Sequence, residues 1–121
     1  TTLTVRINGN GMFASGSDRL AKDVEDTITR VTKAMNDQKG KIIVAGHSDN
    51  VPIKSSRFPS NMHLSLARAE SVKKFMEGIL TDPSRITAEG RSDKEPIESN
   101  DTKEGRAANR RIEILLLREE T

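Results

Sequence analysis

The stretch KIIVAGHSDNVPIKSSRFPSNMHLSLARAESV, residues 41–72, decides the fold of this chain. Its first six residues form a short β-branched run of the kind found in buried strands, and Asp49 stands just past the end of that run. A loop with two prolines follows, and from about residue 61 to residue 78 apolar side chains recur at helical spacing. The stretch therefore predicts a buried strand, a long loop and a helix, with a carboxylate at the strand's carboxyl end.

The residues before this stretch predict one strand and one helix. Apolar and polar side chains alternate over residues 3–7, which is the period of a strand with one face in water. We expect Ser17 or Asp18 to cap the start of the helix that follows and Gly40 to end it. Five apolar residues have the helical spacing: Leu20, Val24, Ile28, Val31 and Met35.

The residues after it predict two more strands. They are ITAEG at residues 86–90 and RIEILLL at residues 111–117, separated by a polar segment that we expect to be a loop. The order is β-α-β-α-β-β, and connections through helices tend to make neighbouring strands parallel while the last strand can return antiparallel. We therefore expect the α/β class: one two-layer sandwich over residues 1–121, with a mixed sheet and both helices on one face.

The composition excludes several classes of function. The chain of 121 residues contains no cysteine, so disulfides, thiolate catalysis and cysteine zinc sites are absent. A net charge of +2 and an aromatic content of 2% leave neither a basic stripe nor stacking rings for nucleic acid. The sequence contains no run of about eighteen apolar residues, so it predicts no membrane span. Because the chain opens on a strand-like pattern, we expect a fragment of a longer protein.

Arg68 stands out because it falls on the apolar stripe of the second predicted helix. A guanidinium placed there needs an acceptor, and the strand end that carries Asp49 should lie close by. Two interpretations are open. The pair could be a structural ion pair, or it could bind a small zwitterion, with Arg68 holding the ligand's carboxylate and Asp49 its ammonium group. The stripe consists of Leu64, Arg68, Val72, Phe75, Met76 and Ile79.

Three motifs resemble the OmpA-like peptidoglycan-binding domain, which also ends the flagellar MotB proteins: GHSDN at residues 46–50, NMHLSLARAESV at 61–72 and GRAANRRIEI at 105–114. Their order and spacing match the family over nearly the whole chain. Within the family, the segments at 9–17, 57–69 and 89–117 look most like the periplasmic extension of type VI secretion membrane anchors of the TssL (DotU-like) group.

This resemblance implies non-covalent binding of peptidoglycan through the diaminopimelate residue of the stem peptide. It also implies a periplasmic domain of an inner-membrane-anchored protein in a Gram-negative bacterium, with other components of a secretion or motor complex as partners and a homodimer as an open alternative. The family's ligand residues fall on Asp49, Arg68, Asn61, Asn109 and Arg110, and His47, Ser48 and Leu64 complete the expected ligand-binding set.

The chain departs from the family's common pattern at two places. The usual His-Thr-Asp is His-Ser-Asp here, and the segment at residues 50–60 is longer than in outer-membrane members. Asn61 could cap its helix instead of touching a ligand. Arg110 and Arg111 alternate along the predicted strand, so at most one of them should face a pocket.

Other kinds of site have weaker patterns. His47 and His63 with Asp49 could suggest zinc, but they lack a clear third ligand, so we expect no metal and no cofactor. His47 could instead orient Asp49 by a hydrogen bond. The lone G-x-G of residues 9–11 fits turn chemistry better than a phosphate loop. We expect no catalysis, and the alternatives to a secretion anchor are a flagellar stator domain and a structural oligomerisation domain without ligand.

Overall fold

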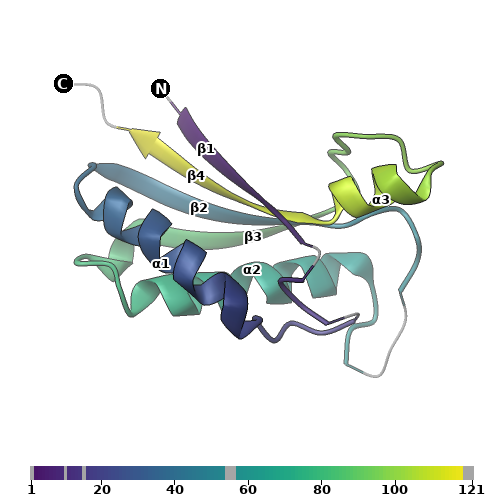
Figure 1. Ribbon diagram of the computed structural model, residues 1–121, viewed down its shortest axis with the longest axis horizontal. Coiled ribbons are helices and arrows are strands. Elements are labelled where there is room, and N and C mark those ends of the chain that lie inside the picture. The colour runs from purple at the N-terminus through teal and green to yellow at the C-terminus, as the bar shows by residue number, and fades with distance from the viewer. Residues whose placement is uncertain (1, 10, 15, 54–56, 119–121) are drawn as a thin grey trace.

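The computed structural model describes residues 2–9, 11–14, 16–53 and 57–118. Helices and strands alternate along the chain, and one face of the sheet carries the two longest helices (Figure 1). The elements are β1 (Thr2–Asn8), α1 (Lys22–Asn36), β2 (Gly40–His47), α2 (Asn61–Glu77), a 3-10 turn (Pro83–Arg85), β3 (Ile86–Ser92), α3 (Lys103–Asn109) and β4 (Arg111–Arg118).

The strand order in the sheet is β1-β4-β2-β3. β2 and β3 run parallel because α2 connects them, whereas β4 lies between β1 and β2 and is antiparallel to both. α1 and α2 lie together on one side of the sheet, and α3 lies at one end on the other side (Figure 1). The predicted two-layer α/β sandwich with a mixed sheet is confirmed.

The core lies between the sheet and the two long helices. Alternation along β4 turns Ile112, Ile114 and Leu116 toward α1 and α2, and each of the three is at most 2% exposed. Val72 and Ile28, on α2 and α1, are fully buried against them. Each such side chain contributes roughly 1.5–3 kcal/mol to folding through burial, so an almost wholly aliphatic core can hold the layers together.

Two glycines let α2 lie close to the sheet. A Cβ at Gly46 would lie 2.1 Å from the backbone oxygen of Ser65, and one at Gly90 would lie 2.8 Å from the backbone nitrogen of Leu66. Gly46 and Gly90 are partners in the parallel register of β2 and β3. The first half of α2 therefore packs directly on the carboxyl ends of these two strands, just before Asp49.

The first helix begins later than predicted. α1 starts at Lys22, and its N-cap residue Ala21 makes no side-chain capping bond. Ser17 and Asp18 lie before the helix, between the two partners of an antiparallel bridge that joins residues 13 and 20. Gly40 does not end the helix either, since α1 stops at Asn36 and Gly40 begins β2.

The prediction missed α3, because it expected a polar loop between the last two strands. The helix is only seven residues long, and Gly105 and Asn109 are its buried positions, so it has no apolar stripe that a sequence pattern could reveal. The side chain of Thr102 caps it by accepting a hydrogen bond from the Gly105 N–H at 2.9 Å. None of the helices in the described part of the chain has the length and apolar character to cross a bilayer.

Candidate functional site

A cavity of about 520 Å³ opens at the carboxyl end of β2. The loop after β2 and the first turns of α2 form two of its walls. The segment after β1 forms a third wall through Gly9, Gly11, Phe13 and Gly16. We call residues 16–20 the strap, because α2 binds two of its backbone carbonyls. Six of the predicted ligand-binding residues line this cavity: Ser48, Asp49, Asn61, Leu64, Arg68 and Arg110.

Asp49 is fixed by two contacts of its own carboxylate. Its Oδ1 accepts a hydrogen bond from the Val51 N–H at 3.0 Å, which closes a local turn. Its Oδ2 accepts a hydrogen bond from Arg110 Nη1 at 2.6 Å, and this contact is also an ion pair. The Asp49 side chain is 11% exposed and the Arg110 side chain 37%, so the arginine side of the pair is open to solvent.

Arg68 binds backbone oxygens of the segment after β1. Its Nε donates to the carbonyl of Ser17 at 2.7 Å and its Nη2 to that of Ala14 at 3.2 Å. The guanidinium also lies over the Phe13 ring, 5.0 Å from the ring centre. Burial lowers the pKa of Arg68, the neighbouring Arg110 charge lowers it further, and Asp18 opposes the shift. The guanidinium nevertheless stays charged, as arginine does in proteins.

The predicted ion pair between Asp49 and Arg68 is not formed. Arg110, at the end of α3, binds Asp49, while carbonyls after β1 bind Arg68. Both side chains still line the same cavity, together with Arg110. The described lining thus carries two guanidiniums and one carboxylate, and Arg68 Nη1 makes no hydrogen bond to any described residue.

Asn61 secures the loop that follows Asp49. Its Nδ2 donates to the carbonyl of Val51 at 2.9 Å and more weakly to that of Asp49 at 3.4 Å. It is not the N-cap of α2, because Ser60 has that role and accepts a hydrogen bond from the His63 N–H at 3.3 Å. Residues 54–56 of the long loop, whose length departs from the family pattern, lie outside the described residues.

Asn109 and Arg111, the first and last residues of the Asn-Arg-Arg motif, do not line the cavity. Asn109 is fully buried and does not line the cavity. Its side chain accepts hydrogen bonds from the N–H groups of Ile97 and Glu98 and donates to the Glu98 carbonyl at 2.9 Å. Arg111 points to Glu113, with 2.8 Å between Nε and Oε2. Only the middle residue of the motif, Arg110, binds Asp49.

His47 lies beneath the opposite face of the sheet and not beside Asp49. Its Nε2 is 3.5 Å from Glu113 Oε1, and neither ring nitrogen has a hydrogen-bond partner among the residues that the structure describes. The expected hydrogen bond to Asp49 is therefore wrong: β2 ends at His47, so the two side chains do not share a strand face. Burial lowers the pKa of His47, the Arg111 charge adds to this, and Glu113 opposes it. The described residues contain no cluster of three potential metal ligands.

Sequence reasoning missed the glycine-rich wall of the cavity. Gly9, Gly11 and Gly16 line it together with Phe13 and Val51. The glycines were visible in the sequence, but their pattern indicated only a turn. Their place beside Asp49 follows from the position of β1 at the sheet edge and from the two hydrogen bonds to Arg68.

The model of the OmpA family matches residues 12–110, which include all of the cavity's charged residues. The chain belongs to the OmpA family. This OmpA-family chain is 35% identical to Motility protein B of Bacillus subtilis over 117 residues, which are 95% of this chain and 45% of that protein. It is 34% identical to the probable lipoprotein YiaD of Escherichia coli, covering 94% of this chain and 51% of the relative. The chain thus spans about half the length of these curated relatives.

Solved structures agree with this assignment. The cell wall anchor of the type VI secretion system from Pseudomonas aeruginosa is 43% identical, with a TM-score of 0.91 over 98% of this chain and 82% of that one. The periplasmic domain of Helicobacter pylori MotB is 27% identical, with a TM-score of 0.86 over 97% of this chain and 76% of that one. The resemblance to OmpA-like domains, with secretion-anchor and MotB relatives, is confirmed.

Proposed function

We propose that this OmpA-family domain binds peptidoglycan non-covalently through the zwitterionic diaminopimelate residue of the stem peptide. One observation carries the proposal: Asp49 and Arg68, of opposite charge, line one open cavity without pairing with each other. Each can therefore bind the opposite charge of a ligand. A zwitterion matches the cavity better than a simple anion, because only a zwitterion offers the Asp49 carboxylate a cation as well as offering Arg68 a carboxylate.

In the proposed complex Arg68 is the fixed anchor. Two carbonyls hold its guanidinium in place, and the remaining N–H groups on Nη1 can donate to the ligand's carboxylate. The ligand's ammonium group binds Asp49 after Arg110 moves outward. Arg110 then places a second cation near the ligand's carboxylate. Ser48 and Asn61 supply hydrogen bonds, and Leu64 supplies an apolar wall.

The other two residues of the predicted set act on the site from outside the cavity. Asn109 holds residues 97–100 against α3 and so positions Arg110, and His47 lies under the strand end that leads to Asp49. A charge-assisted hydrogen bond contributes roughly 1.5–3 kcal/mol, so a few such contacts give a single domain only weak affinity.

At the level of the whole protein, we propose a non-catalytic role. The domain would be the periplasmic part of a longer inner-membrane protein of a Gram-negative bacterium, anchoring a type VI secretion complex to the cell wall. The similarity to a type VI cell wall anchor supports this assignment. The similarity to Motility protein B supports a flagellar stator domain as the second candidate. The Asp49–Arg110 ion pair, which gives Asp49 a partner within the domain, supports a third candidate, a structural domain without a ligand.

Cosedimentation with purified peptidoglycan tests the binding role. We expect Asp49→Asn and Arg68→Gln each to reduce the fraction retained, and free diaminopimelate to release the unaltered protein. Asp26→Asn and Arg30→Gln make the same charge changes on exposed positions of α1 and should bind normally. If both cavity variants are folded and sediment like the unaltered protein, the cavity is not the site.

A further inference from the structure

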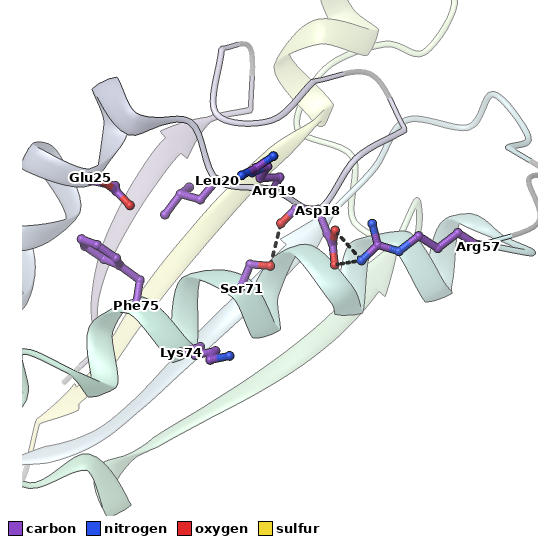
Figure 2. A pocket seen from close by; sticks show the side chains of 8 residues that line it. All are labelled: Asp18, Arg19, Leu20, Glu25, Arg57, Ser71, Lys74 and Phe75. Carbon is purple, nitrogen blue, oxygen red and sulfur yellow. Dashed lines mark hydrogen bonds and ion pairs between the residues drawn. The ribbon is translucent and has the colours of Figure 1, made fainter.

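A second groove lies beside the strap and is lined by Asp18, Arg19 and Leu20 of it (Figure 2). Its volume is about 560 Å³, close to the 520 Å³ of the Asp49 cavity. The strap, the first turn of α1 and the exposed side of α2 enclose it. Leu20 and Phe75 point toward each other and form an apolar floor, and charged side chains surround them (Figure 2).

The charges around this groove do not all cancel. Asp18 is neutralised by Arg57, whose Nη2 lies 3.0 Å from its Oδ1. Arg19, Lys74 and Glu25 also line the groove, and none of the three has an ion-pair partner among the described residues. Two unpaired cations therefore face one unpaired anion, so the groove favours a ligand that carries a carboxylate.

The strap borders both sites, because Gly16 lines the cavity and Asp18, Arg19 and Leu20 line the groove. Arg68 holds the strap through the Ser17 carbonyl, and Ser71 holds it through the Asp18 carbonyl at 2.6 Å. These two residues of α2 are three positions apart, which is about 4.5 Å along a helix. Arg68 lines the cavity and Ser71 lines the groove, so along α2 the two sites border residues that are closer together than the length of two extended peptide residues, at about 3.3–3.6 Å each.

We propose that the groove is an extension subsite for the peptide whose zwitterionic residue occupies the Asp49 cavity. Arg19 and Lys74 take a second carboxylate, one or two residues away along that peptide, and the apolar floor accommodates its aliphatic stem. The inference rests on the proposed function, because it assumes that the first cavity holds a residue of the same ligand.

Calorimetric titration with three ligands tests the subsite. The ligands are free diaminopimelate, a tripeptide in which γ-linked glutamate precedes diaminopimelate, and the same tripeptide with the glutamate carboxylate amidated. The double variant Arg19→Gln/Lys74→Gln should bind the acidic tripeptide about three- to tenfold more weakly. Its affinity for the other two ligands should not change. The control Arg30→Gln/Lys33→Gln removes the same charge from exposed positions of α1 and should bind all three normally.

The outcomes separate the subsite from the main site. Unchanged affinity of the groove variant for the acidic tripeptide overturns the subsite and leaves the Asp49 cavity unaffected. Asp49→Asn should weaken all three ligands, and if it weakens none, the proposed function itself fails. If the tripeptide depends on the groove cations but not on Asp49, the groove is an independent site, which also overturns its role as an extension.

Discussion

Asp49 and Arg68 are held in the cavity by different kinds of partner, and this difference gives them different freedom. The backbone carbonyls of Ala14 and Ser17 belong to the fold itself, so the Arg68 guanidinium is fixed before any ligand arrives. Asp49 is bound by the side chain of Arg110, which is 37% exposed and can move into solvent. A ligand ammonium group therefore exchanges one charge-assisted contact for another at Asp49, which costs less than desolvating a free carboxylate.

Asn109 should be a stability residue and not a ligand contact. We expect Asn109→Ala to lower the free energy of unfolding by about 2 kcal/mol, because it removes hydrogen bonds to Ile97, Glu98 and Asn100 from a fully buried side chain. Urea denaturation measures the change, and Asn50→Ala, at an exposed position, is the matched control. A loss below 0.5 kcal/mol would contradict the role inferred for this side chain.

His47 and Glu113 should make the domain less stable in acid, each over its own pH range. Burial holds the pKa of His47 below its ordinary value of 6.5, so below that pH the unfolded chain binds more protons and stability falls. Burial raises the pKa of Glu113, but hydrogen bonds from Arg111 and Arg6 outweigh it and lower that pKa below 4.5, so its contribution is lost at still lower pH. One group changes stability by at most about 1.4 kcal/mol per pH unit.

Thermal melts at a series of pH values can separate the two groups. We expect His47→Gln to flatten the decline that begins near pH 6.5 and to leave the decline below pH 4.5 in place. His63→Gln, at an exposed position in the first turn of α2, should change neither. An unchanged pH profile in the His47 variant would show that this ring is as easily protonated in the folded state as in the unfolded chain.

The two charged residues Arg68 and Asp49 of the candidate site could be predicted, because each lies within or next to an apolar pattern. Arg68 interrupts the stripe of α2, and Asp49 follows directly on a buried strand. Their partners could not be predicted from the same patterns. The carbonyls that bind Arg68 belong to the backbone, which has no side-chain signature. Arg110 reaches Asp49 only because the short helix α3 precedes it.

At the scale of elements, the site depends on how closely α2 lies on the sheet. This helix supplies Asn61, Leu64 and Arg68 from successive turns of one face, while the strand beneath it leads to Asp49. The helix and strand can meet only where no Cβ stands between them, and Gly46 provides that position. Gly46 does not line the cavity, but it sets how close the cavity wall formed by α2 lies to the wall that follows β2.

Gly46→Ala should be strongly destabilising. The added Cβ would lie 2.1 Å from the Ser65 backbone oxygen, and that helical backbone cannot move without displacing α2. We expect a loss of about 3 kcal/mol, measured by chemical denaturation. Gly78→Ala is the control, since its Cβ would meet nothing closer than 3.6 Å and the residue has φ −70°. A Gly46→Ala protein as stable as the control would show that α2 does not lie as close to β2 as described.

The two long helices and all four strands could be predicted from the sequence, and the short helix α3 could not. Apolar side chains recur at helical spacing in α1 and α2 and alternate in β1 and β4, while β2 is a continuous β-branched run and β3 a short strand pattern. α3 is stabilised by a cap and by hydrogen bonds of Asn109, which are tertiary features. The start of α1 was misplaced because the bridge between residues 13 and 20 competes with capping by Ser17.

At the scale of the whole molecule, a weak site is compatible with strong attachment. Under the proposed function, peptidoglycan presents many copies of the same peptide, and a complex with several copies of the domain would bind it at several points. Linked copies can exceed the affinity of one by about 10²–10⁴ without any new contact. The carboxyl end of β2, whose following residues line the cavity, lies at the end of the sheet away from both termini (Figure 1).

Titration of isotope-labelled protein with free diaminopimelate, followed by amide NMR, tests the account most directly. The amides of Val51 and Gly16 and the Arg68 Nε–H should shift together in a saturable way, and Asp49→Asn should abolish the shifts. Shifts of the same size in that variant, or shifts confined to residues outside the cavity, would contradict the binding of a zwitterion between Asp49 and Arg68.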